Sequence, residues 1–130
     1  MLPLLTHNIS LNPTSTPVTA FPLSWGEPLP TALQPPDIIL AADCCYFEPA
    51  FPLLLDTLER LLGGKEGAMC YFCFKKRRKA DLGFVKMARK RFEAVEGGED
   101  DPDRGVWQRE GIFMWVELFL ITFLWIAKAI

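Results

Sequence analysis

A carboxylate and an aromatic ring stand close together directly after an apolar run in the first half of the chain. Asp43 ends this run, and Tyr46 lies three positions further on. A carboxylate there can orient an amine, and the negative face of an aromatic ring attracts an ammonium or sulfonium cation by about 0.5–2 kcal/mol. The residues alone also allow a simpler interpretation, in which Asp43 caps the next helix and Tyr46 forms a half-buried wall.

The cysteines and the single histidine offer weaker chemistry. Cys70 and Cys73 have the spacing of a metal or redox pair, but the apolar residues around them predict the interior of a strand. Cys44 and Cys45 are adjacent and cannot supply a second pair with suitable spacing, so we predict buried thiols and no metal site. His7 has no partner that suggests catalysis, and we expect it to be exposed near the end of a helix.

Five consecutive basic residues, 75–79, follow the next apolar run. Such a run could bind phosphate or act as a nuclear address. It also stands where a strand leaves the core for a helix, and a basic run in that position is usually a solvated corner.

The candidate residues need a sheet to position them. The segment 37–43 is an apolar run without alternation, which predicts a strand buried on both faces of a parallel sheet. An amphipathic helix follows, with prolines near its start and Gly63-Gly64 at its end. Its apolar face consists of Phe51, Leu54, Leu55, Leu58, Leu61 and Leu62.

A second unit of the same kind is predicted downstream. Residues 68–74 form an apolar strand, and a second helix is then marked by Leu82, Val85, Ala88, Phe92 and Val95. An acidic turn region spans 97–105, and 106–120 is compatible with one or two final strands. Strand, helix, strand, helix predicts a parallel crossover and an α/β fold of the doubly wound class.

The first 36 residues are less regular. Residues 2–11 have helix-compatible apolar positions, and 13–36 is a proline-rich loop region interrupted by a possible short strand at 18–23. In open α/β sheets ligands bind outside the carboxyl ends of the strands. The positions to examine are therefore Trp25-Gly26, Asp43 to Tyr46, and the basic run.

Composition restricts the class of protein. The 130 residues are 50% apolar, enough for one small domain, and the net charge of −2 gives no general attraction to nucleic acid or anionic membrane. Four cysteines in largely apolar surroundings favour a reducing compartment, which predicts a cytoplasmic protein. The apolar segment 111–127 would span about 26 Å as a helix, against a hydrocarbon core of about 30 Å, so a tail-anchored membrane protein stays open as a weaker alternative.

The string from Asp37 to Leu54 resembles the Asp-x-x-Tyr signature region of the seven-β-strand lysine methyltransferases, which use S-adenosylmethionine. The similarity is greatest to fungal enzymes that methylate translation elongation factor. The segment 7–12 and the Leu23-Ser-Trp25-Gly26 turn also resemble that family, over roughly residues 2–115. The fold implied is the C-terminal part of a Rossmann-like sheet that lacks its N-terminal strands.

The resemblance implies roles for four residues. Trp25 matches a tryptophan at the adenine of the cofactor, and Ala42 matches a cofactor-contacting position. Asp43 and Tyr46 match the signature that shapes the pocket for lysine and cofactor. The basic run would then form a rim facing an acidic protein substrate. The family's glycine-rich cofactor loop and its ribose-binding acidic residue are not found in the sequence.

The resulting expectation is a protein-lysine N-methyltransferase, truncated and with activity in doubt. The resemblance implies a protein substrate of the translation elongation factor class, and the predicted state is a monomer. Residues 1–119 would belong to the methyltransferase domain, and 120–130 would be an apolar extension. A non-catalytic fragment or binding remnant stays open as the main alternative.

Overall fold

The computed structural model describes residues 1–79, 81–97 and 100–120. Their helices and strands are, in chain order, α1 (Leu2–Leu11), β1 (Ile38–Ala42), the short 3-10 helix η1 (Glu48–Ala50), α2 (Phe51–Gly63), β2 (Met69–Lys75), α3 (Asp81–Ala88), β3 (Phe92–Glu96), α4 (Arg104–Arg109) and β4 (Ile112–Leu120). The predicted helix over 2–11, the strands over 37–43 and 68–74, and the amphipathic helix that ends at the glycine pair are confirmed.

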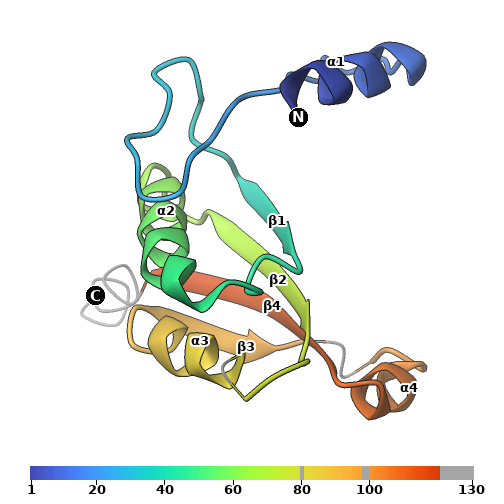
Figure 1. The fold of residues 1–130 in the computed structure, drawn as a ribbon, viewed down its shortest axis with the longest axis vertical. Coiled ribbons are helices and arrows are strands. Elements are labelled where there is room, and N and C mark those ends of the chain that lie inside the picture. The colour runs from blue at the N-terminus through green and yellow to red at the C-terminus, as the bar shows by residue number, and fades with distance from the viewer. Residues whose placement is uncertain (80, 98–99, 121–130) are drawn as a thin grey trace.

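Within the described residues, four strands form one mixed sheet in the order β1-β2-β4-β3 (Figure 1). β1 and β2 are parallel, with Ile38 opposite Met69 and Ala42 opposite Cys73, and α2 lies between them in the chain. β4 runs antiparallel to both of its neighbours. The chain is therefore α/β, and the predicted parallel crossover is confirmed.

The hydrophobic core lies between the sheet and two helices. Phe72 of β2 stacks on Phe84 of α3, with ring centroids 5.0 Å apart, and Phe51 of α2 meets Phe84 edge-on at 5.3 Å. Leu55 and Leu62 of α2 are also almost fully buried. These contacts put α2 and α3 on the same face of the sheet.

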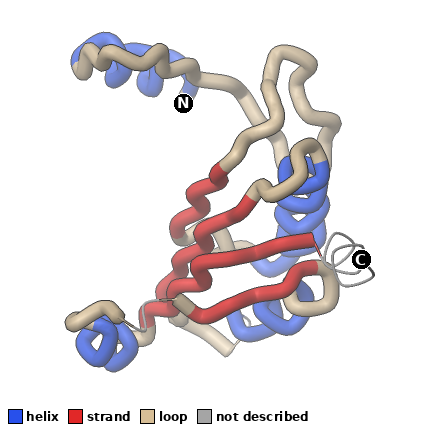
Figure 2. The backbone as a smooth tube through the Cα atoms, turned by 180° about the vertical axis from the view of Figure 1, so that it is seen from behind, coloured by secondary structure: helices blue, strands red, loops and turns tan. Residues whose placement is uncertain are grey.

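The opposite face carries no helix among the described residues, as the view from behind shows (Figure 2). A doubly wound arrangement covers both faces, so the described residues supply only one of its two helical layers. The consequence is clearest in β1, where Leu40 is 79% and Ile38 55% exposed. The prediction that this strand is buried on both faces is wrong for the described chain, because nothing packs on its second face.

The possible strand at 18–23 is not formed. This segment is a loop, and Val18, Phe21 and Leu23 are exposed. A short apolar run becomes a strand only when a neighbouring strand takes up its backbone hydrogen bonds, and no described strand lies beside this one.

Two predictions about the C-terminal half are corrected. The second helix ends at Ala88, and Phe92 and Val95 belong to β3, where pairing with β4 overrides the helical spacing of the apolar residues. Residues 106–109 are helical in α4, so only 112–120 of the predicted final strands is a strand. Gly111, at φ +73, supplies the left-handed turn between α4 and β4.

The described half of the apolar segment 111–127 is thus mostly strand β4. Among residues 1–79, 81–97 and 100–120, no helix is long and apolar enough to cross a bilayer. The predicted extension over 120–130 lies, apart from Leu120, outside the described residues.

Candidate functional site

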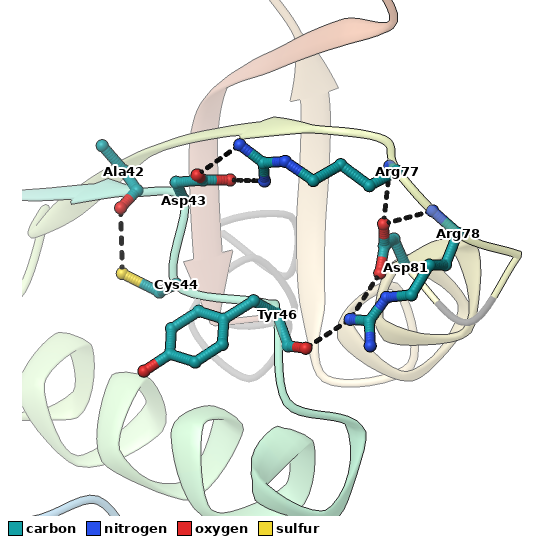
Figure 3. A network of polar contacts seen from close by, with 7 residues as sticks. All are labelled: Ala42, Asp43, Cys44, Tyr46, Arg77, Arg78 and Asp81. Carbon is teal, nitrogen blue, oxygen red and sulfur yellow. Dashed lines mark hydrogen bonds and ion pairs between the residues drawn. The ribbon is translucent and has the colours of Figure 1, made fainter.

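Asp43 follows β1 directly and ends the ladder between β1 and β2. Its backbone N–H donates to the carbonyl oxygen of Cys73 at 2.7 Å. Asp43 has φ +55, a left-handed conformation that costs most residues other than glycine about 1–2 kcal/mol but that Asp and Asn tolerate better. This turn directs the carboxylate toward the loop that follows β2 (Figure 3).

The carboxylate of Asp43 is paired with Arg77 of that loop. Nη1 of Arg77 donates to Oδ1 at 2.6 Å and Nη2 donates to Oδ2 at 2.8 Å, a bidentate pair (Figure 3). Hydrogen bonding to Arg77 holds the pKa of Asp43 below its ordinary value of 3.8. Asp43 is therefore ionised at neutral pH, and its charge is matched by a guanidinium.

A buried carboxylate organises the same loop. Asp81, at the start of α3, is 3% exposed, and its Oδ2 accepts the backbone N–H groups of Arg77 and Arg78, both at 2.8 Å. The side chain of Arg78 donates to Asp81 Oδ1 at 3.1 Å and also to the backbone carbonyl of Tyr46 (Figure 3). One network thus joins the segment after β1 to the start of α3.

The side chain of Tyr46 lies outside this network. It is 64% exposed, and its ring turns away from the Asp43 carboxylate (Figure 3). The simpler interpretation of the pair is wrong on both counts, because Tyr46 is no half-buried wall and the residues at the N-cap positions of η1 and α2 are Phe47 and Ala50, not Asp43. The ring is left available on the surface beside the paired carboxylate.

The Trp25-Gly26 turn is fastened to α2. The N–H of Gly26 donates to Oγ1 of Thr57 at 2.9 Å, and Nη1 of Arg60 donates to the carbonyl oxygens of Gly26 at 2.9 Å and Glu27 at 2.7 Å. Gly26 has φ +84, and a Cβ there would lie 2.7 Å from Leu53. Trp25 itself is partly buried against the core.

Ala42 and Trp25, the expected cofactor contacts, are held by different elements. Ala42 is the last residue of β1 and is exposed, and Trp25 belongs to the turn on α2. Neither residue lines either of two cavities formed by the described residues. A bound cofactor usually loses most of its surface to the protein, so the fit is incomplete within the described residues.

The cysteines behave as structural side chains. Cys70 is fully buried inside β2, as predicted, and Cys73 is partly exposed on the other side of the strand. Burial raises the pKa of Cys45 and of Cys70 to about 12, so these thiols stay protonated at neutral pH. In the described parts of the chain no three His, Cys, Asp or Glu side chains are arranged to hold a metal ion.

The basic run is largely neutralised by its own neighbours. Arg77 pairs with Asp43, Arg78 with Asp81, and Lys75 with Glu110 at 3.3 Å. The described residues give no ion pair to Lys76 or Lys79. The predicted solvated corner is confirmed, since residues 75–79 are all exposed between β2 and α3, but the run does not offer five free cations to a phosphate.

Sequence reasoning named the basic run 75–79 as a position to examine but gave no partner to Arg77 or Arg78, and it did not assign Asp81, Thr57 or Arg60 to the site. For Arg77, Arg78 and Asp81 the predicted strand order already indicated where they would lie. Because the carboxyl ends of neighbouring parallel strands meet at one edge of a sheet, the residues that follow β2 must lie beside those that follow β1. Nothing in the sequence announces the contacts that Thr57 and Arg60 make with the distant turn.

Comparison with known proteins gives one family. Residues 1–91 match the model of a lysine methyltransferase family. The chain is also 39% identical over 105 residues to protein-lysine N-methyltransferase EFM6 of Saccharomyces cerevisiae, which covers 74% of this chain and 43% of that protein. The chain thus spans less than half the length of this curated relative. With the family match extending over Trp25, Ala42, Asp43 and Tyr46, the chain belongs to the lysine methyltransferase family.

Proposed function

We propose that this chain is the part of an S-adenosylmethionine-dependent protein-lysine N-methyltransferase that presents the lysine to the cofactor. The observation that carries the proposal is the family match over residues 1–91. It is supported by the position of Asp43 and Tyr46 at the carboxyl end of β1, the edge at which α/β sheets bind ligands. The fold of the whole enzyme would be the doubly wound, seven-strand sheet of that family, to which the described sheet contributes its C-terminal strands.

The reaction requires alignment more than covalent help from the protein. When bound, S-adenosylmethionine supplies a methyl group on a sulfonium, which the lysine nitrogen attacks in line; holding the two reactants in place can supply about 7–11 kcal/mol of the barrier. In this chain Asp43 would orient the amine, and the ring of Tyr46 would line the entrance. Trp25 would lie against the adenine, and Ala42 against the cofactor at the end of β1.

The incomplete fit bears on what the chain does by itself. Ala42 is exposed, and the sequence has no glycine-rich loop for the amino-acid end of the cofactor. We therefore propose that these residues alone bind S-adenosylmethionine weakly. The same observation favours the second candidate, a non-catalytic remnant that keeps the part of the fold nearest the lysine.

The protein substrate would be a translation elongation factor, and the enzyme would act as a cytoplasmic monomer. This part of the proposal is supported by the resemblance to fungal enzymes that methylate such a factor. The net charge of −2 is in keeping with it, because it gives no general affinity for nucleic acid.

Transfer of a radioactive methyl group from S-adenosylmethionine to a purified elongation factor tests the proposal. We expect labelling that is lost in Asp43→Asn and kept in Lys65→Gln, which removes only the exposed pair with Asp37 at the other end of β1. Calorimetry with S-adenosylmethionine separates the candidates. Binding without labelling of any lysine would count against the enzyme, and the absence of both would establish the non-catalytic remnant.

A further inference from the structure

The bidentate pair between Asp43 and Arg77 leaves the proposed lysine site in an unusual electrostatic state. A carboxylate that receives a lysine would ordinarily attract the ammonium form, which cannot attack a methyl group. Here both carboxylate oxygens already accept from one guanidinium, at 2.6 and 2.8 Å. Each oxygen still has a lone pair free, so the carboxylate can accept a further N–H bond from an amine.

The backbone from which the Arg77 side chain extends is held in place by the loop itself. The backbone N–H groups of Arg77 and Arg78 both donate to Oδ2 of the buried Asp81 carboxylate. Arg78 is anchored at the same time to Asp81 and to the carbonyl of Tyr46. The loop is therefore fastened at two points, and the Arg77 side chain extends back over the end of β1 (Figure 3).

The other groups that face Asp43 do not restore a negative potential. From its own segment and from β2 it faces the thiols of Cys44 and Cys73, whose pKa values are raised by burial and by Asp43 itself. At the start of α3, the charge of Asp81 is matched by Arg78. Lys76 and Lys79, in the same loop as Arg77, have no ion pair among the described residues. Asp43 and Asp81 are thus each paired with a guanidinium, and the Asp43–Arg77 pair carries no net negative charge.

We propose that Arg77 is a specificity-determining residue of the Asp43 site: it cancels the charge with which Asp43 would hold an ammonium, so the site accepts a primary amine in its neutral, nucleophilic form. Asp81 is the positioning residue that keeps Arg77 in place. That the amine belongs to the target lysine rests on the proposed function. A neighbouring cation lowers the pKa of an amine, which is one established way to activate a lysine near neutral pH.

Binding of n-butylamine to the 130-residue chain tests the inference without cofactor or catalysis. The shifts of the Cys44 and Tyr46 amide signals in NMR spectra would report binding at pH 7 and pH 10. An amine pKa of about 10.4 that falls by one to two units on binding makes binding about threefold to thirtyfold tighter at pH 10. The thiols of Cys45 and Cys70 stay protonated at pH 10, because burial raises their pKa to about 12.

Variants assign the effect to Arg77. Arg77→Gln leaves Asp43 unpaired. It is expected to reverse the pH preference, so that the ammonium at pH 7 binds more tightly than the amine at pH 10. Arg77→Lys keeps the positive charge and is expected to bind the amine more tightly at pH 10 than at pH 7, as the unmodified chain does. Lys65→Gln removes an exposed ion pair at the other end of β1 and is expected to change nothing.

Three outcomes would overturn the inference: tighter binding at pH 7 by the unmodified chain, an unchanged order in Arg77→Gln, or no binding at either pH at 100 mM amine. Asp81→Asn, checked for folding by circular dichroism, is expected to weaken the pH preference without touching Asp43. If Asp81→Asn unfolds, the pH preference of amine binding in Arg77→Gln still tests the inference. Tighter amine binding at pH 10 without methyl transfer would contradict the proposed function alone. Methyl transfer together with tighter amine binding at pH 7 would contradict only this inference.

Discussion

Asp81 shows how a single residue can organise a site that it does not enter. Burial raises its pKa, but the two backbone N–H groups of Arg77 and Arg78 and the Arg78 guanidinium together outweigh burial, and the pKa lies below the ordinary value of 3.8. A carboxylate that is buried yet ionised is stabilising only while these donors stay in place. The loop and the carboxylate therefore depend on each other.

Asp81→Asn is expected to lower the free energy of unfolding at pH 7 by about 1.5–3 kcal/mol, the usual value of hydrogen bonds to a charged group. Because the folded-state pKa is depressed, this stability is present above the unfolded-state pKa near 4 and is lost as pH falls through the folded-state value. Urea unfolding at several pH values from 7 to 3 measures how steeply the free energy of unfolding falls with pH. The slope should be shallower in Asp81→Asn than in the exposed control Asp37→Asn, and equal slopes would show that Asp81 contributes nothing.

Asp43 should matter for the site far more than for the fold. Its pair with Arg77 is about half exposed, and exposed ion pairs are worth about 0–1 kcal/mol. Asp43→Asn is expected to cost less than about 1 kcal/mol, because Asn tolerates the left-handed conformation, and to weaken amine binding, because only one acceptor oxygen remains.

Asp43→Ala is the matched variant, and it should cost about 1–2 kcal/mol more because it adds backbone strain at φ +55. Urea unfolding and the amine titration measure the two effects separately. Unchanged amine binding in Asp43→Ala, which has no acceptor oxygen, would remove Asp43 from the site.

At the scale of elements, α2 holds the turn that carries Trp25, the residue proposed to lie against the adenine. Its apolar face packs on the sheet, while Thr57 and Arg60 hold the Trp25-Gly26 turn from the adjoining face. Thr57 is 2% exposed and is fully satisfied, since its hydroxyl accepts from Gly26 and donates to the carbonyl of Leu53. The helix thus fixes the turn by polar contacts that specify one geometry.

Gly26→Ala is expected to lower the free energy of unfolding by about 1–2 kcal/mol, because a Cβ is strained at φ +84 and would lie 2.7 Å from Leu53. Gly83→Ala is the matched control in α3, where a Cβ meets nothing within 4 Å. It should raise stability by about 0.5–1 kcal/mol, the usual gain for Gly to Ala in a helix. Urea unfolding of both variants gives the comparison, and equal effects would mean that the turn is not held against α2.

At the scale of the molecule, the uncovered face of the sheet is the main departure from a closed domain. α2 and α3 cover one face, and Ile38 and Leu40 are exposed on the other. β1 is also the edge of the described sheet, so its outer backbone groups lack strand partners there. An exposed apolar surface of this kind binds hydrophobic dyes.

Leu40→Lys is expected to reduce the fluorescence of the dye ANS with the chain while changing the free energy of unfolding by less than about 0.5 kcal/mol, as is usual for surface substitutions. Val106→Lys, on α4 away from this face, is the control and should leave the dye signal unchanged. Equal signals for Leu40→Lys and the unmodified chain would show that the dye binds elsewhere.

The local pattern of the sequence determined the elements whose apolar spacing and punctuation agree. The helix at 51–63 has a continuous apolar face and a glycine pair at its end, and the strand at 69–75 is an apolar run of suitable length, so both could be predicted. Asp43 was identified because it is a carboxylate directly after an apolar strand, the place where α/β sheets bind ligands. The family resemblance then gave it a role.

Only the tertiary structure decided which residues complete the site and which runs become strands. Phe92 and Val95 continue a helical spacing, yet they are in a strand because β4 offers backbone partners, and 18–23 is a loop because none of the described strands does. Arg77 lies 34 positions from Asp43 in the chain, and their pairing depends on the parallel register of β1 and β2. Local sequence specifies what one segment prefers, whereas partners for hydrogen bonds and charges are chosen by segments that only the fold brings together.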